Sequence, residues 1–127
     1  MENLSIVFDK RLDIEFLQSI YEDDIEHALI VFSQFLQIAP SLMKEMEESY
    51  LSGEVESFRQ KVHKMKPVFS FVGLTKLTAK AEVLEKKCKE VSGIYDISEL
   101  YKELKNQYSE GLPIIENEVN RLKEQVN

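Results

Sequence analysis

The sequence has little of several residue types that many functional sites require. It holds one cysteine, Cys88, so neither an internal disulfide nor a multi-cysteine zinc or iron–sulfur site can form. Its two histidines, His27 and His63, are too few for a three-histidine metal site. No apolar run approaches the ~20 residues of a membrane span, and the acidic N-terminal segment does not resemble a signal peptide. We therefore expect a cytoplasmic protein without a membrane-spanning segment.

Glycine and proline are also scarce, with four and three residues among 127. A protein built of many short strands needs turn residues repeatedly, so this scarcity disfavours an all-β fold. Apolar residues make up 43% of the chain and charged residues 31%, which is typical of a globular protein. The length suits a single domain over residues 1–127.

Negative charge is in excess overall, but it is unevenly distributed along the chain. The net charge of −7 argues against general nucleic-acid binding through phosphate contacts. Residues 1–57 carry a net charge of −10 and residues 91–127 carry −3, whereas residues 58–90 carry +6. This basic segment suggests a local site for an anionic group or an acidic partner. The alternative, for the lysines within residues 86–89, is a solvated helix face.

Apolar residues recur every three or four positions through most of the chain, which is the spacing of amphipathic helices. The pattern predicts a short helix after the N-cap Asp13, a long helix after Asp23 and Asp24, and helices over 54–71, 75–91 and from 97 almost to the C-terminus. The fold that buries these faces most simply is all-α, an antiparallel up-and-down four-helix bundle with a short additional N-terminal helix.

Three residues that disfavour helix formation, Pro40, Gly111 and Pro113, interrupt the helical patterns. We expect a kink at Pro40, and a bend or a frayed second half of the last helix at Gly111 and Pro113. Cys88 lies on the apolar stripe of its helix, so we interpret it as a buried, unreactive thiol. A single bundle that buries its own stripes is expected to be a monomer.

His63 does not follow the apolar pattern of its helix. The apolar positions of residues 54–71 span an arc of roughly 100°, and His63 lies about 140° from the centre of that arc. Arg59, Lys64 and Lys66 surround it, and these positive charges disfavour the imidazolium form. A neutral imidazole is a good nucleophile, and Lys66, one turn on, could reach a phosphoryl group attached to it. An unreactive surface histidine is the alternative.

Other kinds of phosphate chemistry lack the residues that they need. No acidic residue stands at helical spacing from His63, which disfavours a hydrolytic triad. The sequence has no glycine-rich loop of the P-loop type, so a phosphoryl group would have to arrive on another protein.

Residues 63–74, HKMKPVFSFVGL, resemble the signature of histidine-containing phosphotransfer (HPt) domains, most closely those that end bacterial hybrid sensor kinases. The family pattern has a histidine, a lysine three residues on and a glycine ten residues on, here His63, Lys66 and Gly73. It continues in a helix that ends in Leu-Glu, which fits residues 84–85. The resemblance implies a four-helix bundle.

The resemblance also implies a role for each of these residues. His63 would accept a phosphoryl group from the aspartyl phosphate of one receiver domain and pass it to another, while Lys66 would stabilise the phosphohistidine. The chain would be an intermediate of a two-component phosphorelay rather than a true enzyme. It would hold no cofactor, because any magnesium ion would belong to the receiver.

The sequence departs from the family where glycine and a small residue usually follow the lysine. Pro67 and Val68 stand there, and the proline ring fills space that a receiver would use. We expect an active variant with matched partners, and a helical adaptor that binds receivers or another acidic partner without transfer is the alternative. The residues expected to contact a partner are Arg59, Lys64, Pro67, Val68, Ser70 and Phe71.

Two further points stay open at this stage. Phe71 either anchors a partner or folds under the loop at Gly73. His27 has Asp23 four residues before it, a spacing found in metal sites, but we interpret it as a residue that faces solvent. A bundle that binds a metal or cofactor is the third functional hypothesis.

Overall fold

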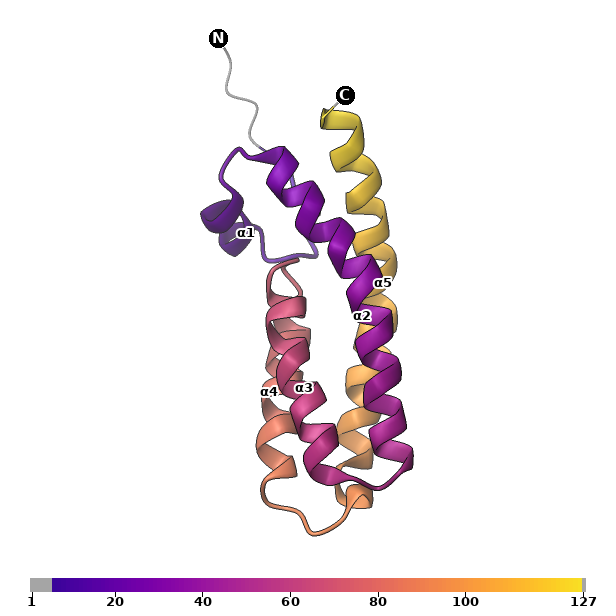
Figure 1. The fold of residues 1–127 in the computed structure, drawn as a ribbon. Coiled ribbons are helices and arrows are strands. Elements are labelled where there is room, and N and C mark those ends of the chain that lie inside the picture. The colour runs from indigo at the N-terminus through magenta and orange to yellow at the C-terminus, as the bar shows by residue number, and fades with distance from the viewer. Residues whose placement is uncertain (1–5, 127) are drawn as a thin grey trace.

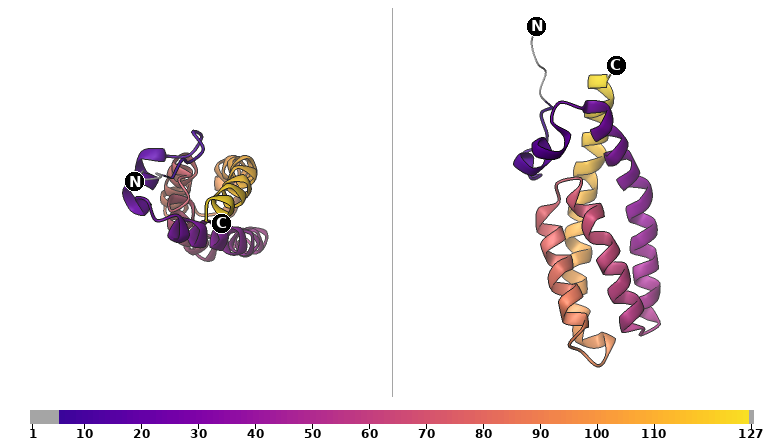
Figure 2. Two further views of the ribbon diagram at one scale, coloured as in Figure 1. Left: turned by 90° about the horizontal axis from the view of Figure 1, so that it is seen from above. Right: turned by 60° about the vertical axis from the view of Figure 1, so that its left-hand side comes forward.

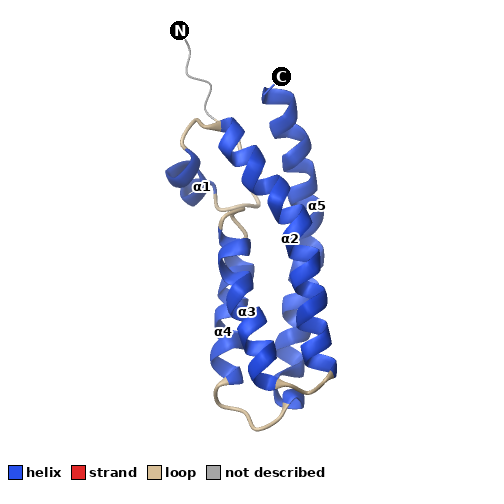
Figure 3. Cartoon of the chain, in the orientation of Figure 1, coloured by secondary structure: helices blue, strands red, loops and turns tan. Residues whose placement is uncertain are grey.

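The computed structural model describes residues 6–126, and their regular structure is entirely helical (Figure 3). The elements in chain order are α1 (Ile14–Tyr21), α2 (Ile25–Leu51), α3 (Val55–Ser70), α4 (Thr75–Cys88), the short 3-10 helix η1 (Ile94–Ile97) and α5 (Ser98–Val126). The prediction of an all-α protein is therefore confirmed for this part of the chain.

The helices α2 to α5 pack against one another. α3 contacts α2 and α4, and α5 likewise contacts α2 and α4 (Figures 1 and 2). α2 and α5 are long, with 27 and 29 residues, whereas α3 and α4 have 16 and 14. In Figure 1 the long helices extend past the upper ends of α3 and α4, and α1 lies above those ends.

The first two helices begin where acidic caps predict them to begin. The side chain of Asp13 accepts a hydrogen bond from the backbone N–H of Phe16, and Asp24 does the same for His27. α2 continues through Pro40 to Leu51. The apolar spacing on both sides of the proline is therefore sufficient to maintain one helix.

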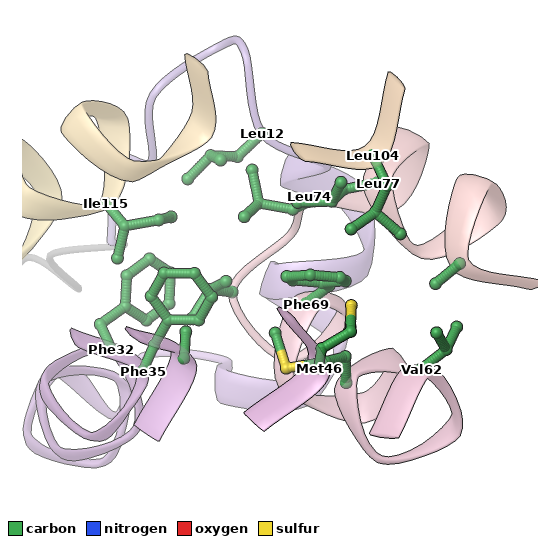
Figure 4. Close-up of a cluster of buried hydrophobic side chains, with 14 of the residues drawn as sticks. Leu12, Phe32, Phe35, Met46, Val62, Phe69, Leu74, Leu77, Leu104 and Ile115 are labelled. Carbon is green, nitrogen blue, oxygen red and sulfur yellow. The ribbon is translucent and has the colours of Figure 1, made fainter. Parts of the chain in front are cut away.

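The core contains the predicted apolar stripes together with residues that precede α1, namely Ile6, Phe8 and Leu12 (Figure 4). Each of the helices α2 to α5 contributes fully buried side chains to it, including Phe32, Met46, Phe58, Val62, Phe69, Leu84, Leu104 and Ile115. Cys88 is buried as well, and burial raises the pKa of its thiol to about 11. The thiol is therefore protonated at neutral pH, as expected for an unreactive core cysteine.

The structure corrects the sequence prediction at three places. α4 ends at Cys88 rather than at Val91, and η1 follows it where no helix was predicted. The expectation of a frayed second half in the last helix is wrong, because α5 continues through Gly111 and Pro113 to Val126. Gly111 is buried against Leu74, and the helix beyond it contributes further core residues, so tertiary packing stabilises the helix despite these two residues.

The turn between α3 and α4 is fixed by α1 and the residue before it. Gly73 has a φ of +78°, and a Cβ added there would lie 2.7 Å from Cδ1 of Leu17. The backbone N–H of Asp13 donates to the carbonyl of Gly73 at 2.9 Å, and the Thr75 hydroxyl donates to the Asp13 carboxylate at 2.8 Å. These contacts hold the turn that follows α3, the helix that carries His63.

Candidate functional site

His63 stands on the exposed side of α3. Its side chain is 63% exposed, whereas Val62 and Met65, its neighbours in the apolar stripe, are fully buried. The outward orientation predicted from the helical spacing is confirmed. The helix also runs without interruption through Pro67, four residues later.

A buried carboxylate from the neighbouring helix binds the imidazole. Oε2 of Glu85, on α4, lies 2.8 Å from Nδ1 of His63, and the Glu85 side chain is only 8% exposed. Sequence reasoning assigned Glu85 only to the family spacing and missed this contact. A signal was present, because Glu85 follows Leu84 on the apolar stripe of α4, where a charged residue needs partners.

The ionisation of Glu85 decides which nitrogen of His63 carries the proton. Burial by itself raises the pKa of this carboxyl, but hydrogen bonds from Lys66 and His63 outweigh burial and hold it below the ordinary value. An ionised carboxylate can only accept, so Nδ1 of His63 is the donor. The neutral ring then has its lone pair on Nε2, which has no hydrogen-bond partner among residues 6–126.

Lys66 belongs to the same network, and its ammonium group is already paired with carboxylates. Its Nζ lies 2.5 Å from Oε1 of Glu85 and 2.9 Å from Oε2 of Glu82, and its side chain is 20% exposed. Hydrogen bonds to Glu85 and then to Glu82 raise the pKa of this ammonium group. Lys66 is therefore one turn from His63, as predicted, with its charge directed at two carboxylates.

Arg59 lies on the other side of Glu85. Its guanidinium forms two hydrogen bonds with Glu56, at 2.5 and 2.9 Å, and approaches Oε2 of Glu85 at 3.5 Å. The hydrogen bond to Glu56 raises the pKa of Arg59. Contacts with the side chains of His63, Lys66 and Arg59 thus offset the free-energy cost of burying the ionised carboxylate of Glu85.

Two hollows flank the exposed side of α3. The first, which we call the polar pocket, has a volume of about 420 Å³ and is lined by Arg59, Gln60, His63, Lys64, Glu85 and Lys89. The second, the apolar groove, has a volume of about 160 Å³ and is lined by Val31, Gln34, Phe35, Ile38, Pro67, Val68 and Phe71. α4 contributes to the polar pocket, and α2 contributes to the apolar groove.

The residues predicted to contact a partner divide between these hollows. Arg59 and Lys64 line the polar pocket, while Pro67, Val68 and Phe71 line the apolar groove. Ser70 is half-buried and lines neither of them.

Phe71 presents its side chain to the apolar groove. It is 46% exposed, and its backbone carbonyl accepts a hydrogen bond from the Tyr21 hydroxyl at 2.6 Å. This exposure disfavours the alternative in which Phe71 folds under the loop at Gly73, and its role as a partner anchor stays a prediction.

The other candidate residues lie outside this cluster. His27 is exposed, and its ring packs against that of Tyr21 in a T-shaped arrangement with 5.1 Å between ring centroids. Within residues 6–126, no three His, Cys, Asp or Glu side chains are grouped as metal ligands. No helix in this part of the chain is both long and apolar enough to cross a membrane.

Comparison of the chain with protein-family models, with curated proteins and with solved structures gives no match. The interpretation of the site therefore depends on the geometry around His63 and on the resemblance of residues 63–74 to the HPt signature.

Proposed function

We propose that this chain is a histidine phosphotransfer protein of a two-component phosphorelay. One observation carries the proposal: His63 is exposed, and the buried carboxylate of Glu85 binds its Nδ1. This arrangement makes Nε2 the nucleophilic nitrogen and directs it away from the protein. In this proposal α2 to α5 form the antiparallel up-and-down four-helix bundle of the HPt family, with α1 as an additional N-terminal helix.

The chemical step needs no proton transfer. Nε2 of His63 attacks the phosphorus of an aspartyl phosphate on a receiver domain, and the bond between phosphorus and the carboxylate oxygen breaks. The leaving group is the free aspartate, and Nδ1 of His63 keeps its proton. The ring becomes positively charged, and the adjacent carboxylate of Glu85 stabilises that charge. When an aspartate of a second receiver attacks the phosphorus, the P–N bond breaks and the ring returns to its neutral form.

The polar pocket at His63 and the apolar groove further along α3 suit a receiver partner. An acidic receiver site would face the polar pocket, and an apolar side chain of the receiver would enter the apolar groove at Pro67, Val68 and Phe71. Any magnesium ion would be supplied by the receiver. The protein would act as a cytoplasmic monomer and an intermediate in the transfer, and not as a kinase.

A helical adaptor that binds receivers without transfer is the second candidate. Pro67 and Val68 favour it, because they form part of the apolar groove at positions where the HPt signature has glycine and a small residue. A proline ring one turn beyond His63 fills space that a receiver would use. Such an adaptor would bind a receiver but acquire no acid-labile phosphate.

A labelling experiment tests the proposal and separates the two candidates. Incubation with a panel of phosphorylated receiver domains is expected to transfer a label that is lost in acid and retained in base. His63→Gln is expected to abolish the label, because the amide has no nucleophilic nitrogen, while His27→Gln serves as the matched control on an exposed histidine. Full labelling of the His63 variant would refute the proposal. Binding of a receiver without any labelling would favour the adaptor.

A further inference from the structure

The polar pocket contains two lysines that form no ion pair among the described residues. Three of its lining residues besides His63 are basic, namely Arg59, Lys64 and Lys89. Arg59 is bound to Glu56 and Glu85, whereas Lys64 and Lys89 are exposed and form no ion pair within 4 Å among residues 6–126. Lys64 lies on α3, directly after His63, and Lys89 is the C-cap of α4. The pocket therefore combines the imidazole with two available ammonium groups on neighbouring helices.

Lys66 differs from these two lysines in both position and partners. It does not line the polar pocket, and its ammonium group binds Glu85 and Glu82. If Lys66 turned toward a phosphoryl group on His63, it would leave the buried carboxylate of Glu85 without its shortest ion pair. That carboxylate must remain ionised to hold the proton on Nδ1 of His63.

We infer that Lys64 and Lys89 bind the phosphoryl group carried by His63, and that Lys66 is a positioning residue which acts through Glu85. This inference rests on the proposed function and assigns its phosphate contacts to different residues from those that the HPt resemblance implies. Ammonium groups suit the role because each offers three donors and turns freely on a flexible stem. Located on two helices, they can contact a phosphoryl oxygen from two sides of the pocket.

A phosphodonor that needs no partner protein can test the pocket by itself. Phosphoramidate serves here, because its nitrogen carries its own protons. Nε2 of His63 attacks the phosphorus, the P–N bond of the donor breaks, and ammonia leaves with the electron pair. Nδ1 keeps its proton on Glu85, so the step balances without another reactant.

Two measurements distinguish phosphate contacts from a structural effect. The first is the rate of loading of His63 at low salt. The second is the pH midpoint at which the ³¹P resonance of the phosphohistidine titrates. Nearby ammonium groups favour the dianionic phosphoryl group and lower this midpoint, so their removal raises it.

The test variant and its control each remove two positive charges. Lys64→Gln with Lys89→Gln is expected to slow loading on the order of tenfold and to raise the ³¹P midpoint. Lys76→Gln with Lys87→Gln removes the same charge from exposed positions on α4 outside the pocket, and neither measurement should change. Lys64→Arg with Lys89→Arg should retain most of the wild-type loading rate, because arginine keeps the positive charge.

Lys66→Gln is expected to behave differently from the pocket lysines. It should slow loading only while Glu85 is present and leave the ³¹P midpoint in place, so its effect should vanish in a Glu85→Gln background. The effects of the substitutions at Lys64 and Lys89 should persist in that background.

Each remaining outcome has a definite meaning. An unchanged midpoint in the Lys64 and Lys89 double variant, or a raised midpoint in Lys66→Gln alone, would overturn the inference. If wild-type His63 takes a label from a receiver but none from phosphoramidate, the assigned phosphate contacts fail and the proposed function stands. If phosphoramidate loads His63 with the expected lysine dependence but no receiver does, the phosphate contacts stand and the phosphorelay role fails.

Discussion

Two glutamates are buried in the described part of the chain, Glu85 beside His63 and Glu118 near the N-terminal segment, and their partners are of different kinds. Glu85 binds three side chains, and one of them, His63, is largely exposed with a ring nitrogen left free. Glu118 accepts a hydrogen bond from the backbone N–H of Asp9 at 3.0 Å and pairs with Arg121.

The contacts of Glu118 connect chain segments rather than prepare a reactive group. Through Arg121, which donates to the carbonyl of Val7 at 2.9 Å, it joins α5 to residues 7–9. The comparison shows that burial of a carboxylate does not by itself indicate a functional site. What matters is whether one partner remains exposed with an unused reactive atom, and only Glu85 satisfies this condition.

The largest expected effect is on the rate of phosphoryl transfer, which should depend on Glu85 and not on Glu118. Glu85→Gln removes the charge that holds the proton on Nδ1 of His63, and the amide can present either a donor or an acceptor to the ring. We expect the rate of phosphoryl transfer from a receiver to fall about a hundredfold, roughly 2.7 kcal/mol of activation free energy. Rapid-quench labelling measures this rate.

Glu82→Gln is the matched control for that substitution. It removes a carboxylate that contacts Lys66 but not His63, so the transfer rate should change by no more than about threefold. Equal losses in the two variants would show that the contact between Glu85 and His63 is not what activates the ring.

The next effect is expected on stability, and Glu118 should dominate it. Glu118→Ala leaves the N–H of Asp9 without its acceptor and opens space in the interior, so we expect a loss of about 2 kcal/mol in the free energy of unfolding. Urea denaturation measures the loss, and Glu116→Ala, at an exposed position on the same helix, should change it by less than about 0.5 kcal/mol. Labelling of His63 should be unaffected in both variants. A Glu118 variant that folds normally yet fails to be labelled would contradict this division of roles.

The difference between these two regions also explains how much could be predicted from the sequence. Helix positions, the caps at Asp13 and Asp24, and the exposure of His63 depend on local spacing, so they can be predicted from one segment at a time. The contact between His63 and Glu85 depends on how α3 and α4 are aligned side by side. These two residues are 22 positions apart, so their contact can be predicted only from the alignment of the two helices. No local sequence pattern specifies that alignment.

The same reasoning applies to the last helix and to Lys66. Glycine and proline lower the helical preference of residues 111–113, but contacts with distant Leu74 and with the N-terminal segment outweigh that local preference. For Lys66, the spacing from His63 correctly placed it one turn away, but the two carboxylates that bind its ammonium group come from α4. Roles that depend on the partners of a side chain therefore require the tertiary structure.

The smallest expected effect is the pH dependence of the stability that Glu85 contributes. Its pKa in the folded protein lies below the ordinary carboxyl value of 4.5, because the hydrogen bonds from Lys66 and His63 outweigh burial. A carboxyl group whose pKa is depressed on folding stabilises the protein above its unfolded pKa, and this contribution is lost as the pH falls through the folded value. Wild type should therefore exceed Glu85→Gln in unfolding free energy by about 1 kcal/mol near pH 7, and the difference should shrink steadily below about pH 4.5. Urea denaturation of both proteins at several pH values measures it. A difference that grows as the pH falls below about 4.5 would mean that Glu85 is destabilised in its ionised form, and its role in holding the proton on His63 would then be wrong.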